Sequence, residues 1–430
     1  MIRKTALAAA LEKLAQDPQE RLIVGVDLTK KCIQVCYREP DTSKIINHQL
    51  ARKKFWDFLK NPPFPALTVA MEACGSSNYW AQVCVRFGHL PMIIPAETVY
   101  GYHAGNKDDA NDAKCIWRVA FMPEIKTIRP RDQDNQMMMA LLRRREETTR
   151  TLTREANSVR SMLYEMGVAC PEGPYAVMNE LQKFSKETDK EAPNSTRSAA
   201  LRVMSSDACN RIKTLISSLQ TMDNFIISYA ENDPDCRLLM TIPYIGPLTA
   251  VTILIAMGDP DNFPNGRALA AYFGFAPCHT GTGGNVAILG IPTKGNRCVK
   301  RMLYEPALAM YTWVMKPFKK EEGDDAKDNE DKVPEPISQW IFDLAIKKPA
   351  KKVVCAIVNK LCRICWAVLK HQTAYVQSKS SLVPPSVTSP EGKVKRCRAT
   401  RKANASRILN IIECFESYLD ASSASEAAAA

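Results

Sequence analysis

The chain has 430 residues, and its 58 Lys and Arg against 46 Asp and Glu give a formal net charge of +12. A hydrophobic content of 46% and a charged content of 24% exclude a wholly disordered or fibrous protein. No apolar run approaches the roughly 18–20 residues that a membrane span needs, so we expect no membrane partner. The length predicts two or three domains. The basic excess favours an anionic partner, of which nucleic acid is the commonest.

The cysteines and the first twenty residues indicate a cytoplasmic protein. The 15 Cys are odd in number, scattered and set in apolar stretches such as VVCAIVNKLCRICWAVL. This is typical of reduced core thiols, not of disulfides. The N-terminus begins like a signal peptide but soon carries Glu12, Lys13, Asp17 and Glu20. That pattern favours a short amphipathic helix over an export signal.

Residues 20–130 alternate strand and helix patterns. RLIVGVDLTKKCIQVCYRE holds two apolar runs around a turn at Thr29, Lys30 and Lys31, and predicts a β-hairpin. FPALTVAMEA and HLPMIIPA are two further apolar runs, and SNYWAQVCVRFG between them predicts a helix. Strands and helices alternating in this way predict an α/β sheet domain.

Residues 131–235 are polar and have the periodicity of long helices. One run carries many arginines, Arg143 and Arg144 among them, and a second run, ACNRIKTLISSLQTMDNFIISYA, follows the break KEAPNSTRS. Two antiparallel helices or a coiled coil fit this pattern. The arginines are explained equally well as a solvated helix face and as nucleic-acid contacts.

Residues 236–375 combine dense turn signals with short helices. In TIPYIGPLTAVTILIAMGD, a turn at Ile245 and Gly246 precedes a new helix, a geometry that can hold a phosphate through backbone N–H groups. It looks like one helix-hairpin-helix element of non-specific DNA binders, and a plain interhelical turn is the alternative. Within this stretch we expect a charged linker over 316–336 and an amphipathic helix over about 351–370. Residues 376–430 predict a mostly disordered basic tail.

Four acidic residues have a context that suits a metal ion. Asp27 follows the apolar run LIVGV, and Glu72 follows LTVAM. Asp109 and Asp112 lie three residues apart at the expected start of a helix, so they share one face. Carboxylates from two strands and one helix would form an all-oxygen site suited to Mg²⁺, and a pair of such ions clamps a phosphodiester. Taken singly, each acid is better explained as a turn residue or a helix cap, as for Asp112.

Several segments, taken in order, resemble one family: the DEDD transposases of the IS110 insertion-sequence group, which includes the Piv-type DNA invertases. In the front half the matching segments are VGVDLTKKCIQVCY, VAMEACGSSNYWA and NKDDANDAKCI. In the back half they are IPYIGPLTAVTILIAMGDPDNFPNGRALAAYFGFAP, GGNVAILGIPTKGNRCVKRML and ISQWIFDLAIKKPAKKVVCAIVNKLCRICWAVL. The resemblance covers residues from about 20 to 375.

The resemblance implies a fold and a function. It implies a RuvC-like (RNase H-like) N-terminal domain in which Asp27, Glu72, Asp109 and Asp112 bind Mg²⁺, a helical coiled coil, and a mostly helical C-terminal transposase domain. It also implies DNA transposition guided by an RNA that the element encodes. The partners would then be DNA, a guide RNA and further copies of the chain, in a dimer or tetramer whose subunits share the active site.

The sequence departs from the family at one decisive place. Family members carry a nucleophilic serine in a Ser-Ser-Gly-Gly-like turn after the segment that here reads GFAP. This chain reads Cys-His-Thr-Gly-Thr-Gly-Gly, so Gly281 and Thr282 stand at the serine positions, and no serine lies between Asp235 and Lys300. Thr282 keeps a hydroxyl but adds a methyl group beside it. Three explanations remain open: Thr282 replaces the serine, strand transfer is lost in a decayed copy, or the local alignment is displaced.

A basic segment follows this turn. Lys294 and Arg297, with Lys300 and Arg301, predict a helix start that contacts backbone phosphates, and a solvated helix cap is the alternative. We therefore carry three hypotheses: a DNA transposase and recombinase, a nucleic-acid-binding protein without recombination, and a RuvC-like nuclease only.

Overall fold

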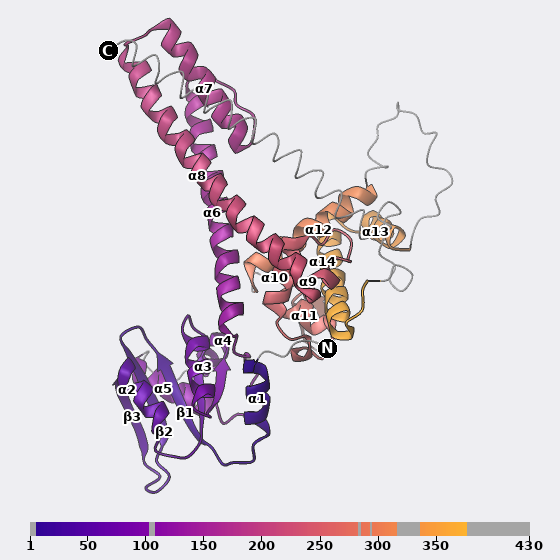
Figure 1. Cartoon of the computed structure of the whole chain (residues 1–430). Helices are drawn as coiled ribbons and strands as arrows, with labels where there is room; N and C mark the ends of the chain where they lie inside the picture. The colour runs from indigo at the N-terminus through magenta and orange to yellow at the C-terminus, as the bar shows by residue number, and fades with distance from the viewer. Residues whose placement is uncertain (1–5, 103–107, 283–284, 293–294, 316–335, 376–430) are drawn as a thin grey trace. The chain divides into compact units, whose positions relative to one another are not determined.

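A computed structural model describes residues 6–102, 108–282, 285–292, 295–315 and 336–375 (Figure 1). Its contacts divide into two compact units. The first comprises the residues up to Met222 together with Ile255–Asn262, and the second comprises Asp223–Leu254 together with the residues from Phe263 onwards. Residues 316–335 of the predicted linker and the whole predicted tail, 376–430, lie outside the described residues.

The first unit begins with a helix and a five-stranded sheet. The helix is α1 (Ala6–Gln16), as the amphipathic pattern predicts. The sheet has the order β3-β2-β1-β4-β5. Its strands are β1 (Leu22–Leu28), β2 (Cys32–Arg38), β3 (Ile45–Ala51), β4 (Leu67–Glu72) and β5 (Leu90–Ile94). β1, β2 and β3 are antiparallel neighbours, whereas β4 runs parallel to β1, and β5 parallel to β4.

The predicted hairpin is confirmed as β1 and β2, and the two later apolar runs are confirmed as β4 and β5. β3 was not predicted. It is the edge strand beyond β2, and no residue along it is fully buried. A half-solvated edge strand needs few apolar residues, so IINHQLA lacks the signal that identifies a buried strand.

Helices cover both faces of the sheet. On one face, Val24 and Val26 of β1 pack with residues of α2 (Arg52–Lys60) and α3 (Ser77–Arg86). On the other face, Ile23 and its neighbours pack with α4 (Ala96–Gly101) and α5 (Asp109–Val119). The alternation along β1 follows from the two-residue period of a strand. The expected α/β sheet domain is confirmed as a layer of strands between two layers of helices.

Three long helices complete the first unit: α6 (Gln133–Glu165), α7 (Pro174–Glu191) and the beginning of α8 (Thr196–Asn232). They lie side by side in Figure 1 and share one apolar core that includes Leu163, Leu181 and Ile212. Arg211 and Glu155 add an ion pair at 3.0 Å. The long helices and the break before Thr196 are as predicted, but the segment folds into three helices where the sequence pattern favoured two.

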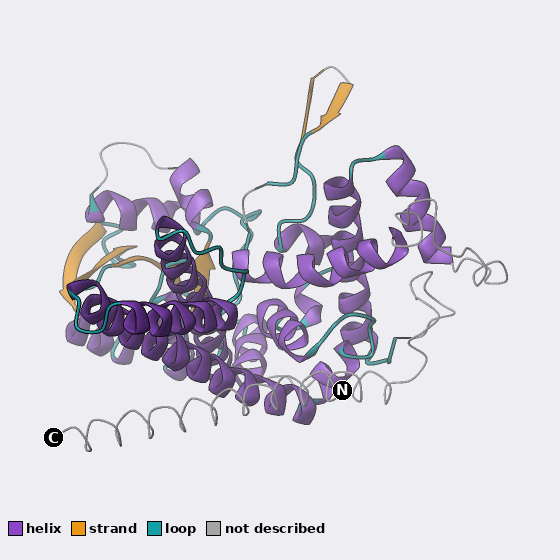
Figure 2. Ribbon diagram, turned by 90° about the horizontal axis from the view of Figure 1, so that it is seen from above, coloured by secondary structure: helices purple, strands orange, loops and turns teal. Residues whose placement is uncertain are grey.

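The second unit is mostly helical. Its helices after the end of α8 are α9 (Pro234–Leu239), the greater part of α10 (Pro247–Met257), α11 (Gly266–Tyr272), α12 (Arg297–Met315), α13 (Pro336–Lys347) and α14 (Ala350–His371). α14 confirms the predicted amphipathic helix, and its buried stripe includes Ile357, Cys362 and Cys365, as expected for core thiols. A short hairpin of β6 (His279–Thr282) and β7 (Asn285–Ile288) extends away from these helices (Figure 2). Among the described residues, none of the helices is both long and apolar enough to cross a membrane.

Candidate active site

A glycine in β1 lets α5 lie directly on the sheet. A Cβ atom built on Gly25 would lie 2.4 Å from the backbone nitrogen of Trp117 and 2.6 Å from the carbonyl oxygen of Ala113. Any larger residue would therefore force the helix away. The Trp117 indole Nε1 also donates a hydrogen bond to the Ile23 carbonyl at 3.1 Å. These contacts hold α5 against β1 and fix where the helix begins.

The start of α5 is fixed by two further contacts. The Asp108 carboxylate accepts the Asn111 N–H at 2.8 Å and is the N-cap of the helix. Asp112 is therefore not the cap, which removes the main structural explanation offered for it. From the sheet, the Asn47 amide donates to the Ala110 carbonyl at 2.9 Å, and Gln34 donates to Asn47 at 2.7 Å. The first turn of the helix is thus tied to β2 and β3.

This packing brings Asp109 and Asp112 to the level of Asp27. Ala113 lies over Gly25, and Asp27 is two residues further along the same face of β1. Two strand residues advance about 6.6 Å, and one helical turn advances about 5.4 Å. Asp109, about one turn before Ala113, is therefore displaced along α5 by nearly the distance that separates Asp27 from Gly25 along β1.

Glu72 joins the group from the neighbouring strand. β1 and β4 are parallel, and their last registered pair is Val26 with Met71. Asp27 and Glu72 lie one step beyond that pair. Ala70, two residues before Glu72, packs with α5 residues, so Glu72 belongs to the same face. All four predicted acids therefore converge where β1 and β4 end and α5 begins.

The convergence is visible in the electrostatics of Asp27. Burial, followed by the negative charges of Asp109, Asp112 and Glu72, raises the pKa of the Asp27 carboxyl from 3.8 to about 6. A backbone hydrogen bond at Leu28 opposes the rise. Carboxylates that repel one another in this way are stabilised when a cation enters among them.

The donor set fits a hard divalent cation, because it consists of carboxylate oxygens alone. Within the part of the chain that the structure describes, however, no three His, Cys, Asp or Glu side chains already form a cluster able to hold an ion. The four carboxylates lie in the same region, but their oxygens do not surround a common point at which an ion could bind. The assignment of a metal to them remains a prediction.

Thr282 lies in the second unit, at the end of β6. It pairs with Asn285 of β7, and its side chain is exposed. The hydroxyl at the predicted serine position is thus presented at the end of a projecting hairpin and is open to a substrate.

Two family profiles match the chain. One, described as the transposase IS116/IS110/IS902 family, matches residues 236–321, and a DEDD transposase profile of the IS110 group matches residues 24–167. The chain is 29% identical to a probable family 20 transposase of Pseudomonas aeruginosa, over 82% of this chain and 98% of that protein. It is 26% identical to the transposase for insertion sequence element IS1328 of Yersinia enterocolitica, with the same coverage. A pilin gene-inverting protein of Moraxella bovis is 21% identical over 82% of this chain and 97% of its own length.

The chain belongs to the IS110 family of transposases. The predicted resemblance is therefore confirmed. The front match contains all four acids of the transposase, and the back match contains Thr282 and the turn at Gly246.

The predicted phosphate-binding turn of the transposase lies between α9 and α10. Ile245 is buried, and its N–H donates to the Ile242 carbonyl at 3.2 Å, so neither its side chain nor its N–H faces solvent. Gly246 is half-buried, and its carbonyl accepts the first hydrogen bond of α10, from Ala250. The unusual backbone angle of the turn is at Tyr244, with φ of 63°, and not at the glycine.

The predicted basic contacts of the transposase have different environments. Arg143 and Arg144 are exposed on α6, and Arg301 and Arg297 are exposed on the first turns of α12. Lys300 instead donates to the Pro292 carbonyl at 2.7 Å, and burial lowers its pKa. Lys294 lies outside the described residues.

Sequence reasoning missed three contributors to the site. Gly25 and Asn47 position α5, and Asp108 caps it. Asp108 could have been found, because Asp is one of the residues preferred immediately before the first residue of a helix. Gly25 and Asn47 carry no such local signal, since their partners lie far away in the chain.

Proposed function

We propose that this transposase cuts and rejoins DNA with the help of Mg²⁺ bound by Asp27, Glu72, Asp109 and Asp112. The observation that carries the proposal is the convergence of these four carboxylates from β1, β4 and α5. The sheet order, with three antiparallel strands followed by two parallel ones, supports a RuvC-like fold for this unit. The shared core of α6, α7 and α8 supports the predicted coiled-coil region.

The four carboxylates would hold the metal, which when bound polarises a scissile phosphate and neutralises its charge. Asp27 is central to the group, because its carboxyl feels the charges of the other three. Gln34 and Asn47 hold the α5 acids in place from the sheet.

We propose that the covalent step belongs to Thr282. Its hydroxyl oxygen would form a bond to phosphorus while the bond from phosphorus to the deoxyribose oxygen breaks; the hydroxyl proton passes to solvent, and the released deoxyribose oxygen takes up a proton from solvent and leaves as a free hydroxyl end. A second strand end would later displace Thr282 and rejoin the DNA. The exposed position of Thr282 supports this role, and we retain guidance by an RNA and assembly into a dimer or tetramer as parts of the proposal.

A threonine at the position where the resemblance places the nucleophilic serine favours one second candidate, a metal-dependent nuclease that cuts DNA without rejoining it. The methyl group of Thr282 crowds the approach to phosphorus. An excision or inversion assay in cells separates the two, because a nuclease alone yields broken DNA and no recombinant.

Strand cleavage by the full chain tests the metal site. We expect Asp27→Asn to lower Mg²⁺-dependent cleavage of a plasmid carrying the element ends by at least about 100-fold, the loss typical of removing one electrostatic contributor. DNA binding should persist. Asp57→Asn, the same change on the exposed side of α2, is the matched control and should cleave as the parent does. Cleavage that survives in Asp27→Asn, or in the presence of a chelator, would refute the proposal.

A further inference from the structure

The second unit contains a cavity of about 490 Å³ between α11 and α14. Its position follows from one glycine. A Cβ atom on Gly266 would lie 2.7 Å from the Cα of Arg363, so only glycine allows these two helices to approach so closely. The close approach places Arg267, the next residue of α11, beside Lys360 and Arg363 of α14 at the edge of the cavity.

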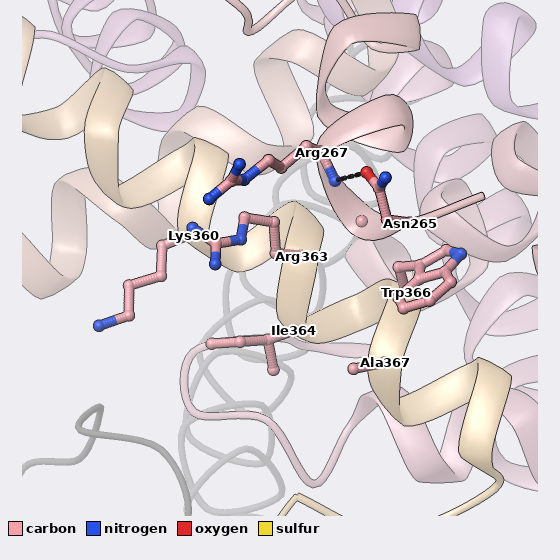
Figure 3. A pocket seen from close by; sticks show the side chains of 8 residues that line it. Asn265, Arg267, Lys360, Arg363, Ile364, Trp366 and Ala367 are labelled. Atoms are coloured by element: carbon pink, nitrogen blue, oxygen red, sulfur yellow. Dashed lines mark hydrogen bonds between the residues drawn. The ribbon is translucent and has the colours of Figure 1, made fainter. Parts of the chain in front are cut away.

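Three cations therefore gather at one place. Figure 3 shows the side chains of Arg267, Lys360 and Arg363 extending to the same side. Residues 360 and 363 are three apart, so they share a face of α14. Arg267 and Arg363 are exposed and available to a ligand, whereas Lys360 is half-buried and stands 4.7 Å from the ring centre of Trp340.

The lining of the cavity offers Arg267 and Arg363 no counter-charge. None of its lining residues is acidic, and within the described ranges neither the Arg267 nor the Arg363 side chain forms an ion pair. Burial and, secondly, the charge of Arg363 lower the pKa of Lys360. Arg267 and Arg363 are like charges brought together without an acid, so they repel one another, and a bound anion relieves that repulsion.

The remaining lining adds an apolar wall. Ile364, Trp366 and Ala367 lie on α14 beside the cations, and a low-dielectric wall strengthens the attraction between a cation and an anion. Asn265 completes the rim. Its Oδ1 accepts the N–H groups of Arg267 and Ala268, both at 3.0 Å, so this end of α11 is fixed before any ligand arrives.

We propose that the cavity lined by Arg267, Lys360 and Arg363 binds a backbone phosphate of nucleic acid. The inference rests on the proposed function and names a place at which the transposase holds its nucleic acid. Arginine presents donors in a planar fork that matches the oxygens of a phosphodiester, and two such forks beside a lysine are suited to one phosphate and its neighbour. The site reads charge and not bases, so it holds strands of any sequence.

Binding of labelled oligonucleotides to the full-length protein, followed by fluorescence anisotropy over a range of salt concentrations, tests the site. We expect the double variant Arg267→Gln/Arg363→Gln to bind at least about tenfold more weakly near 0.15 M salt, as expected from the loss of charge-assisted contacts. The slope of log K against log salt should become shallower by about 2, which is about 1 for each lost phosphate contact. Arg363→Lys keeps the charge but loses the fork, and should lie between the parent and the double variant.

The matched control removes the same charge elsewhere in the unit. Lys347→Gln/Lys351→Gln changes two exposed residues near the start of α14 and should leave affinity and slope close to those of the parent. Because Arg267 and Arg363 are exposed, thermal denaturation should show all variants folded alike.

Probes of one sequence, made as single-stranded DNA, duplex DNA and RNA, identify the occupant, since a loss with any of them supports the site. Unchanged affinity and slope in the double variant, or an equal loss in the control, would overturn the inference while leaving the proposed function intact. A parent protein that binds none of the probes would instead overturn the proposed function.

Discussion

The crowding of negative charge around Asp27 predicts that the metal-free transposase is more stable without this acid. Ionised Asp27 is repelled by Asp109, Asp112 and Glu72 and is also partly buried. Replacing it with asparagine removes the charge and keeps the shape. We therefore expect Asp27→Asn to raise the free energy of unfolding of the first unit in the absence of divalent cations, although the same change should lower cleavage.

The magnitude follows from the pKa of Asp27, which rises from 3.8 to about 6. One pKa unit corresponds to about 1.4 kcal/mol, so the rise has a ceiling of about 3 kcal/mol. The carboxyl is partly exposed, and solvent screening reduces the effect to about 1–2 kcal/mol. For a domain of 150–250 residues, this corresponds to a rise in Tm of about 2–8 °C.

The stability difference between Asp27→Asn and the parent should depend on pH in a defined direction. The folded protein holds the Asp27 proton more tightly than the unfolded chain, so ionisation of Asp27 opposes folding. The advantage of Asp27→Asn should be complete at pH 7–8, shrink as the pH falls through about 6, and vanish near pH 4. Thermal denaturation of parent and variant in a chelator, at a series of pH values, measures it.

Added Mg²⁺ should reverse the order of stability. A ligand that binds only the folded state stabilises it, so Mg²⁺ should raise the Tm of the parent and have little effect on Asp27→Asn. Asp57→Asn, an exposed change on α2, should match the parent under all conditions. Equal stability of parent and Asp27→Asn at pH 8 without metal, or an equal response to Mg²⁺, would refute the reasoning from the gathered carboxylates.

Substitutions at two other positions, Gly25 and Thr282, test the fold and the covalent step. Gly25→Ala would place a Cβ atom 2.4 Å from the Trp117 backbone nitrogen, so it should destabilise the first unit by about 3 kcal/mol and impair cleavage. Gly101→Ala, whose new Cβ has no atom within 4 Å, is the control and should do neither. A normal Tm for Gly25→Ala would contradict the close packing of α5 on β1. Thr282→Ala should abolish both strand cleavage and inversion or excision in cells, because the Thr282 hydroxyl is the proposed nucleophile, and Thr282→Ser should recombine at least as well as the parent. Strand cleavage that persists in Thr282→Ala would favour the nuclease. Recombination by Thr282→Ala would exclude Thr282 from the mechanism.

Local sequence patterns identified the elements that hold the candidate acids. The apolar runs of β1 and β4 are buried strands; Glu72 is the last residue of β4, and Asp27 is the last but one of β1. The long helices and α14 were predicted for the same reason, since their apolar stripes have the helical period. β3 escaped prediction because an edge strand needs no continuous apolar run.

The sequence by itself determined the family, four of the five strands of the sheet and the presence of long helices, because each of these is marked by a motif or an apolar period within one short segment, and it predicted the four candidate acids. Only the tertiary structure decided how α5 meets β1, which residue caps it, and which cations of α11 and α14 share a cavity. Gly25 and Gly266 control both helix contacts, yet each does so by leaving space for a backbone far away in sequence. A glycine in the sequence does not show which distant backbone will pack against it, so these arrangements become evident only in the folded structure.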